Sequence, residues 1–229
     1  MYQIDHSAFI SDLHFNHYYV NKDGKPRGVT LFERKQFKTI EEHDSYLISH
    51  LADWASRHEH WNLFILGDFG DLTQVKNLMH HLRKHDIYVI GVHGNHESSH
   101  ADSVLEDILD EYHKYPYWVS NRVFVSHEPK YPCPIGNLNI HGHLHGMKLD
   151  DNAFMCVSAH VINYQPISWK AVTKRLQKIP TERHEFLREP YSRKLYLTQP
   201  NPDAITLSGK KTGLIDLQKS LELNHDDKQ

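Results

Sequence analysis

Five short segments of this chain end in side chains that can bind a metal ion or carry a proton. These residues are Asp12 and His14, Asp68, Asn95 and His96, His127, and the pair His143 and His145. An apolar run typical of a strand precedes each segment, and residues two apart in extended backbone point to the same face, so Asp12 and His14 can reach one point. Oxygen and nitrogen donors without cysteine suit divalent cations such as Mn²⁺, Fe²⁺, Zn²⁺ or Mg²⁺ rather than a structural thiolate site. Two such ions about 3.5–4 Å apart, bridged by one carboxylate, can clamp the attacking and leaving oxygens of a phosphoryl displacement.

The order of these segments resembles that of the calcineurin-like metallophosphoesterase superfamily. The family's five blocks are Asp-x-His, Gly-Asp, Gly-Asn-His-Asp/Glu, a lone His after a strand, and Gly-His-x-His. All five are present in that order between Asp12 and His145, over more than half of the chain. The third block ends in Glu97, where many small members of the family carry Asp.

The resemblance implies a centre with two divalent metal ions. The bridging ligand would be Asp68, with Asp12, His14 and His145 completing the first site and Asn95, His127 and His143 the second. A water or hydroxide between the ions, its pKa lowered by their charge, would be the nucleophile. We expect Mn²⁺, with Fe, Zn, Ni or Mg as the alternatives.

His96 is not expected to be a ligand. In the family, the histidine of Gly-Asn-His lies beside the metals as general acid or as a stabiliser of transition-state charge, so His96 joins Asp68 as a predicted catalytic residue. Glu97 or Asp71 could orient it. For Asp71 we favour a different role, as the cap of a helix that begins near Thr73.

Residues near the first block provide predicted substrate contacts. Asn16-His17 resembles the Phe-Gly-His of a small phage and bacterial subgroup, in which an arginine and a Phe follow at about the positions of Arg34 and Phe37. The expected substrate-binding residues are His17, Arg34, Asn95 and His96. Asn16 replaces the subgroup's glycine, so the conformation of this loop is open.

A basic, turn-rich stretch follows at residues 21–28. We favour a mobile surface loop here. The alternative is a rim that meets an anionic substrate through Lys22, Lys25 or Arg27.

Strand and helix patterns alternate along the chain and predict an α/β protein. Apolar residues at helical spacing predict helices over 39–58, 73–85, 102–113 and 168–177, and β patterns predict a hairpin over 115–126 and a strand over 154–158. The first of these helices begins with a Thr-x-x-Glu capping pattern at Thr39. With the resemblance, the expected fold is an αββα four-layer sandwich of two mixed β-sheets flanked by helices.

Two regions divide the 229 residues. Residues 1–178 form the predicted metallophosphoesterase domain, and residues 179–229 a C-terminal extension of uncertain structure. Prolines interrupt the extension, and its short apolar runs at 194–197 and 204–207 could be edge strands.

Composition limits the partners. The net charge is −3, which does not indicate a broad field for duplex DNA. No stretch approaches the roughly 18 apolar residues that a membrane span needs, and the N-terminus lacks a signal-peptide pattern, so we expect a cytoplasmic protein without membrane contact.

Cysteines and the remaining histidines carry little functional signal. We expect both cysteines, Cys133 and Cys156, to be free thiols. We expect most of the 21 histidines to be solvated surface residues. Nine of them fall in helical patterns or their flanks: His43, His50, His58, His60, His80, His81, His85, His100 and His113.

The sequence therefore predicts a metal-dependent phosphoesterase that hydrolyses a small phosphodiester or nucleotide. One alternative is a nuclease acting on single strands or ends, in which basic residues of 22–34 and Lys130 would gather into one groove. Nucleic acid is the less favoured partner. A second alternative is an inactive scaffold that binds a protein, although such proteins lose ligands and this chain has lost none. The oligomeric state is open.

Overall fold

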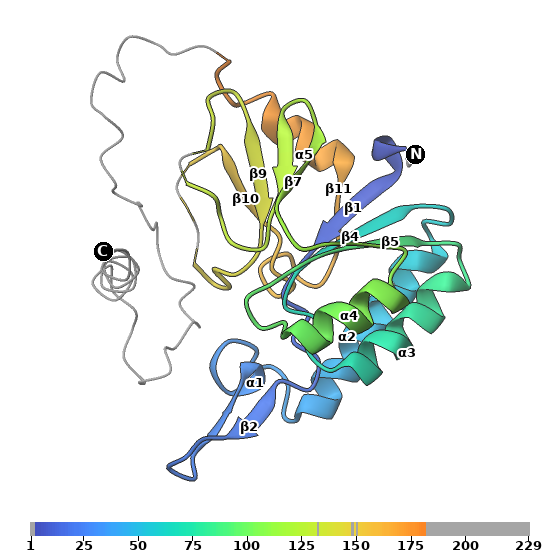
Figure 1. Ribbon diagram of the computed structural model, residues 1–229, viewed down its shortest axis with the longest axis vertical. Helices are drawn as coiled ribbons and strands as arrows, with labels where there is room; N and C mark the ends of the chain where they lie inside the picture. The colour runs from blue at the N-terminus through green and yellow to red at the C-terminus, as the bar shows by residue number, and fades with distance from the viewer. Residues whose placement is uncertain (1–2, 132, 148, 150, 182–229) are drawn as a thin grey trace.

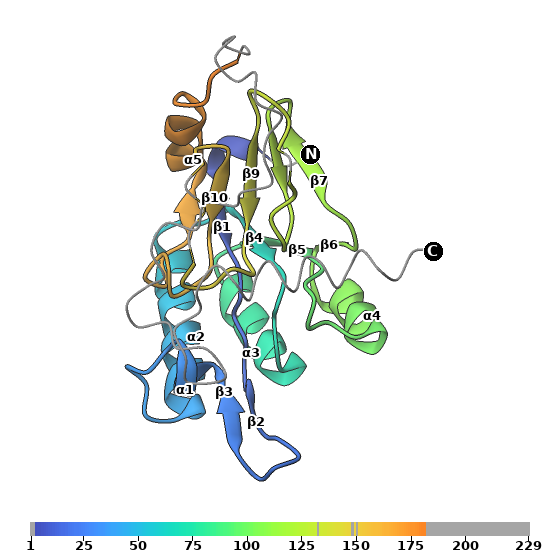
Figure 2. The same cartoon turned by 90° about the vertical axis from the view of Figure 1, so that its left-hand side faces the viewer.

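The computed structural model describes residues 3–131, 133–147, 149 and 151–181. In these ranges two main sheets lie against each other, and helices cover one of them (Figures 1 and 2). The strands are β1 (Ser7–Ile10), β2 (Tyr18–Val20), β3 (Pro26–Gly28), β4 (Asn62–Leu66), β5 (Tyr88–Val92), β6 (Glu111–His113), β7 (Tyr117–Ser120), β8 (Val123–Val125), β9 (Leu138–His141), β10 (Phe154–Cys156) and β11 (Ile167–Ser168). The helices are η1 (Ile4–His6), α1 (Val29–Phe32), α2 (Ile40–Ser56), α3 (Leu72–Arg83), α4 (Ser99–Ile108) and α5 (Trp169–Leu176).

Parallel pairing dominates both main sheets. The first has the order β11-β1-β4-β5-β6, in which only β11 pairs in antiparallel fashion. The second has the order β10-β9-β8-β7, in which only β7 pairs in antiparallel fashion. The hairpin β2-β3 forms a separate two-stranded sheet. The expected mixed α/β class, with two mixed sheets and flanking helices, is confirmed.

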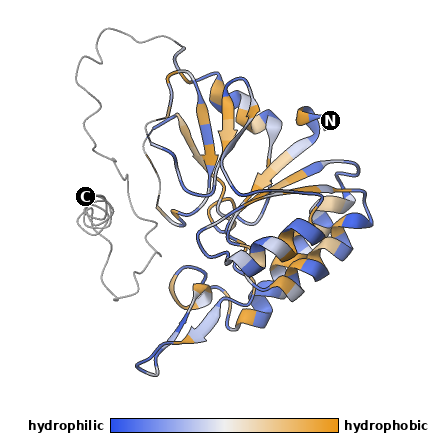
Figure 3. Ribbon diagram, in the orientation of Figure 1, coloured by the Kyte–Doolittle hydropathy of each residue, from blue (hydrophilic) through white to orange (hydrophobic). Residues whose placement is uncertain are grey.

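Alternation along the first sheet's strands decides what each side chain packs against. Ala8 and Ile10 belong to the core shared with α2, α3 and α4, whereas Phe9 points into the core between the two sheets. There its ring stacks on Phe64 of β4, with the ring centroids 4.8 Å apart. In Figure 3 the central strands of the main sheets are largely hydrophobic and the outer surfaces of the helices hydrophilic. This burial fixes the first sheet between the helices and the second sheet.

The outer face of the second sheet is covered by loop residues. Phe124 and Phe154 form a small core there with Cys133, Leu144 and Leu149. Helix α5 instead packs at the edge strand β11, and its Trp169 and Val172 contribute to the core between the sheets.

Several elements match the sequence predictions. Helix α2 begins as expected, because the Thr39 side chain accepts a hydrogen bond from the Glu42 amide at 3.1 Å. The hairpin expected over 115–126 is formed by β7 and β8. Both cysteines are free, as predicted.

The helix predicted over 102–113 was wrong at both ends. Ser98 caps α4 by accepting from the Ala101 amide, so the helix begins earlier, at Ser99. It ends at Ile108 because the chain then turns into β6, the edge strand parallel to β5. Sheet pairing, which is non-local, overrode the helical pattern here.

Residues 21–28, for which a mobile surface loop was favoured, are the turn and second strand of a hairpin. In this hairpin β2 pairs with β3, with Tyr18 opposite Gly28 and Val20 opposite Pro26. The runs 194–197 and 204–207 lie outside the described residues, and the domain boundary after residue 178 stays a prediction. In the described part of the chain, no helix has both the length and the apolar composition that crossing a membrane requires.

Asp71 caps α3, as favoured from the sequence. Its carboxylate accepts hydrogen bonds from the amides of Thr73 and Gln74, both at 3.0 Å. We predict that Asp71→Ala lowers the free energy of unfolding by about 1 kcal/mol, the usual value of such a cap, whereas Asp71→Asn retains most of it. Denaturant unfolding measures the difference. Equal stability of the two variants would contradict the capping role.

Candidate metal centre

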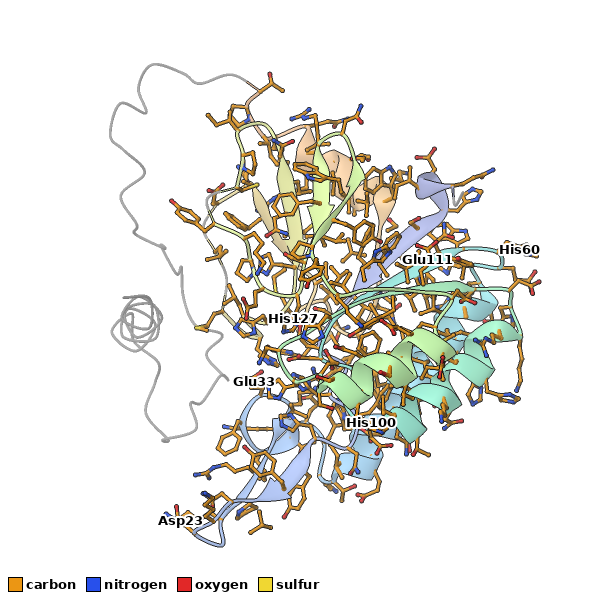
Figure 4. All side chains as sticks on the ribbon, viewed as in Figure 1. Asp23, Glu33, His60, His100, Glu111 and His127 are labelled. Carbon is orange, nitrogen blue, oxygen red and sulfur yellow. The ribbon has the colours of Figure 1, made fainter. Side chains whose placement is uncertain are left out.

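The predicted site residues meet where the two sheets join. Asp12 and Asp68 each stand two residues beyond the parallel strands β1 and β4, and Asn95 stands three beyond β5. His127 follows β8 of the second sheet in the same way, and Figure 4 places it between the two sheets. The carboxyl ends of parallel strands lie at one edge of a sheet, where open α/β sheets bind ligands. Side chains distant in sequence therefore converge here.

One cluster consists of Asp12, His14, Asp68 and His145, whose donor atoms lie within 4.8 Å of one another. His14 Nε2 is 3.3 Å from His145 Nε2 and 3.4 Å from Asp68 Oδ2. The side chains of Asp12, His14 and Asp68 are at most 2% exposed. Two imidazoles and two carboxylates in this arrangement could hold one divalent cation.

A second cluster lies on the other side of Asp68. Asn95 Oδ1 is 2.8 Å from both His127 Nε2 and His143 Nδ1. His127 Nε2 is also 3.3 Å from Asp68 Oδ1. The two oxygens of one carboxylate thus face two different sets of donors, which is the arrangement that a bridging ligand requires.

Groups behind the donors fix which nitrogen faces the centre. The Nδ1–H of His127 donates to the carbonyl of Leu66 at 2.9 Å, which leaves Nε2 free to act as a ligand. His145 Nδ1 lies 2.6 Å from a carboxylate oxygen of Glu33, so its Nε2 likewise faces the first cluster. Glu33 and His160 form a further acidic and imidazole group with His145, and they belong to this same site.

Asp12 is held by donors on every side. The hydroxyls of Ser11 and Ser158 each donate to its Oδ2 at 2.6 Å, and the amide of His143 donates at 3.1 Å. Burial by itself raises the pKa of Asp12, but His145, His127 and the two hydroxyls outweigh burial and lower it. Asp12 is therefore a fixed carboxylate anion.

Burial and the neighbouring charges also shift the pKa values of the imidazoles. Burial lowers the pKa of His14, helped by the positive charges of His145 and Arg34, so this ring stays neutral with a lone pair available. Burial opposes protonation of His127 as well, but Asp68 and Asp12 raise its pKa to about 9. The negative electrostatic potential that Asp68 and Asp12 create at His127 favours a proton there, and it would also attract a metal cation.

Five of the proposed ligands have left-handed backbone, which is uncommon outside glycine. Their φ angles are Asp12 56°, His14 50°, Asp68 55°, His143 65° and His145 48°. Each such residue costs about 1–3 kcal/mol, and such residues cluster at functional sites. Backbone hydrogen bonds between the loops hold them: the amides of Asp12 and His14 donate to the carbonyls of Gly67 and Asp68 at 3.0 and 2.9 Å.

Close packing explains two glycines in the motifs. A Cβ on Gly142 would collide with Asp12 Oδ2 and with the Ser11 hydroxyl. A Cβ on Gly94 would collide with the amide and carboxylate of Asp68. Both glycines let a second loop approach a carboxylate closely.

Glu97 supports the centre without contacting a proposed ligand's side chain. Its carboxylate accepts hydrogen bonds from the amides of Asp68, Phe69 and Gly94 at 3.0, 2.9 and 2.7 Å. It therefore ties the loop after β5 to the loop after β4. Glu97 and Asp71 were the predicted partners that would orient His96. Glu97 binds backbone amides and Asp71 caps α3, and the structure shows no contact of either carboxylate with the His96 ring.

His96 and His17 lie at the opening of the site. The His96 side chain is 51% exposed, and its Nε2 is 3.9 Å from Asp68 Oδ2. The half-buried ring of His17 stacks on His14 with centroids 4.7 Å apart, and lies 5.3 Å from the ring of His96. Burial and the positive charge of His96 lower the pKa of His17 to about 4.

Arg34 lies behind the site rather than in it. It is fully buried, and its guanidinium donates to the carbonyls of Leu13, at 3.0 Å, and Asp12. The guanidinium also lies 2.5 Å from His43 Nε2, and its carbon is 5.9 Å from the centroid of the Tyr164 ring. In this structure Arg34 has no surface that a phosphate could reach, so it positions the Asp12 loop instead of contacting substrate as predicted.

His43 was wrongly predicted to be a surface residue. It is fully buried, with Nδ1 2.7 Å from Asp44 Oδ1. The amide of Asn16 donates to the other oxygen of Asp44 at 2.8 Å, and Asn16 has a left-handed φ of 51°, a conformation that glycine adopts freely and asparagine tolerates. This explains how Asn16 can stand where the similar subgroup has glycine.

Sequence reasoning missed the supporting residues Glu33, Ser11 and Ser158. Ser11 precedes the first motif directly and could have been suspected as its support. Glu33 and Ser158 carry no such signal, because each reaches the site through folding: Glu33 from the end of α1, and Ser158 from beyond β10.

One comparison with known proteins identifies a family. A family model described as calcineurin-like phosphoesterase matches residues 6–214. Among solved structures, the chain is similar to the crystal structure of the Pseudomonas putida nuclease MPE, with 18% sequence identity, a TM-score of 0.40 and coverage of 62% of each chain. The match therefore spans less than two thirds of that structure, and at this TM-score it carries no argument. The comparison with curated proteins finds no match.

The contact between Glu33 and His145 predicts a change in metal affinity. We expect Glu33→Gln to weaken the binding of Mn²⁺ at one site by about 10–100-fold, because the amide no longer favours the proton on Nδ1 of His145. Titration calorimetry on metal-free protein measures this. Glu41→Gln, at an exposed position of α2, is the matched control and should change the affinity less than twofold. Equal affinities of the two variants would contradict the role of Glu33.

Proposed function

The chain belongs to the calcineurin-like phosphoesterase family, and from this membership we propose that it hydrolyses a phosphate ester, most simply a small phosphodiester or a nucleotide, with one divalent cation in each cluster. The observation that carries the proposal is the position of Asp68, whose Oδ2 faces the first cluster and whose Oδ1 faces the second. We propose Mn²⁺ as the cation, with the ligands assigned as in the sequence prediction. Bound cations would polarise the phosphoryl oxygens and lower the pKa of a water molecule.

Residues of the chain would bind the cations, contact the phosphate and donate a proton. The carboxylates of Asp12 and Asp68 would retain the cations, and the neutral amide of Asn95 would leave the loaded site positive toward phosphate. His96, half-exposed at the opening, would donate a proton to the leaving oxygen. His17 beside it would contact the phosphate. The burial of Arg34 removes it from this set.

The inactive-scaffold alternative receives no support from the geometry. A protein-binding scaffold has no need for buried carboxylates that face oriented imidazoles, and such an arrangement is costly to keep without a cation or protons between them.

A second candidate, a nuclease acting on single strands or ends, is favoured by one observation. The hairpin β2-β3 beside the site exposes aromatic and basic side chains together. Lys130, however, lies 3.5 Å from Glu128, so it adds little unpaired charge to a groove.

The proposal is tested by metal analysis together with turnover of bis-p-nitrophenyl phosphate and p-nitrophenyl phosphate. With added Mn²⁺, the wild type should hydrolyse at least one of them. Asp68→Asn should lower metal content and reduce turnover by at least about 10³-fold, because one oxygen of the shared carboxylate becomes an amide nitrogen. Wild-type protein without bound metal and without turnover under added Mn²⁺ would refute the enzyme assignment.

His96 gives a separate prediction. His96→Ala should retain the bound metal and lower the rate by about 10²–10⁴-fold for substrates with poor leaving groups, and by less for p-nitrophenyl esters, which need no general acid. Metal analysis and rates against leaving-group pKa measure the two effects. Loss of metal in this variant would instead make His96 a ligand.

A further inference from the structure

The hairpin β2-β3 continues directly from the candidate site. It projects from the body of the protein in both Figure 1 and Figure 2. Its base is fixed to the site, because the amide of His17 donates to the His14 carbonyl at 3.2 Å and the amide of Val29 donates to the His17 carbonyl at 3.3 Å. A molecule bound on the hairpin would therefore lie in a defined position relative to the two clusters.

A row of stacked rings connects the clusters to the hairpin. His14 and His17 stack with centroids 4.7 Å apart, and His17 and Tyr19 stack with centroids 5.9 Å apart. The interplanar angles are 21° and 23°, so the three rings are close to parallel. Tyr19 is 51% exposed at the outer end of the row. Its ring presents a flat surface on which a further planar group could stack.

Cations share this face of the hairpin. Tyr19 pairs directly with Arg27 across the two strands, so their side chains lie on the same face. Lys25 directly precedes β3, and its carbonyl accepts a hydrogen bond from the amide of Asn21 at 2.9 Å. This bond extends the hairpin by one pair, so alternation places Lys25 on that face as well. The guanidinium carbon of Arg27 lies 5.6 Å from the Phe32 ring centroid, which holds it beside the hairpin. We call Tyr19, Lys25 and Arg27 the stacking face.

The opposite face has a different character. It carries Tyr18, Val20 and Pro26, of which Tyr18 is 48% exposed. The two tyrosines are thus adjacent in sequence, about equally exposed, and on opposite faces. They provide a matched pair for an experiment.

The positive charge of the hairpin favours the binding of a polyanion. Residues 21–28 contain three cations, Lys22, Lys25 and Arg27, against one carboxylate, Asp23. None of the three takes part in an ion pair among the described residues. The chain as a whole has a net charge of −3, so this positive charge is local.

We propose that the stacking face binds single-stranded nucleic acid, with a base on Tyr19, phosphates at Lys25 and Arg27, and a phosphodiester bond of the same strand at the two clusters. Exposed aromatic rings interleaved with cations are how proteins bind unpaired strands, because every unpaired base has a free face for stacking. A duplex keeps its bases stacked on one another and offers no such face. The inference rests on the proposed hydrolysis of a phosphate ester and, within it, argues for the second candidate, in which the substrate is single-stranded nucleic acid.

Binding is measured by fluorescence anisotropy with the full chain and Mn²⁺. The probe is a fluorescein-labelled single-stranded oligothymidylate with phosphorothioate linkages, which resist hydrolysis. Tyr19→Ala should weaken binding about 10-fold, as expected for one base-stacking ring, and Tyr19→Phe should restore it. Tyr18→Ala is the control and should stay within twofold of the wild type. The pair Lys25→Gln and Arg27→Gln should reduce the slope of log affinity against log salt by about 0.7 for each lost phosphate contact.

Three results would overturn the inference: no binding by the wild type, equal losses in Tyr18→Ala and Tyr19→Ala, or equally tight binding of a duplex with the same linkages. Failure of this inference is separable from failure of the proposed function. Turnover of bis-p-nitrophenyl phosphate without oligonucleotide binding would overturn the stacking face alone. Oligonucleotide binding without any turnover under added Mn²⁺ would overturn the proposed function.

Discussion

Two buried carboxylates at the junction of the sheets constrain the rest of this structure. Asp12 and Asp68 are almost completely shielded from water, and a buried negative charge is stable only beside hydrogen-bond donors or positive charge. The protein supplies hydroxyls to Asp12, amides to both, and imidazoles between them. The imidazole pKa values diverge accordingly: burial keeps His14 neutral, whereas the carboxylates favour protonated His127. A site built in this way retains a strong attraction for cations.

Placing those carboxylates requires unfavourable backbone. Left-handed residues cluster in the loops after β1, β4 and β9, and their cost must be met by the packing of the strands that carry them. Parallel pairing of β1 with β4 aligns two of these loops, and backbone hydrogen bonds then join them. Two side chains also hold the loops in place. Glu97 accepts hydrogen bonds from backbone amides, and Arg34 donates hydrogen bonds to backbone carbonyls. The geometry of the site therefore depends on these supporting residues as well as on the candidate metal donors.

The local and the overall electrostatics of the molecule differ. A slightly negative chain carries a positive hairpin next to the two buried carboxylates, Asp12 and Asp68. The negative charge is buried and would be neutralised by cations, whereas the hairpin's charge is exposed to solvent and to ligands of opposite sign. The net charge of the chain therefore does not predict the charge of a ligand that binds the hairpin.

The amino-acid sequence by itself determined the family, the α/β class and which residues are candidate metal donors, because apolar runs ending in Asp, Asn or His repeat in a specific order. It also determined local features such as the caps at Thr39 and Asp71, which depend on residues two to four apart. Tertiary structure alone decided the roles of Glu33, Ser158, His43 and Arg34, since each acts through a partner far away in the chain or through its own burial. It also decided that Glu111–His113 is a strand and that residues 18–28 form a hairpin. The physical reason is the same in each case: periodicity and capping are properties of neighbouring residues, whereas burial and pairing depend on which segments meet.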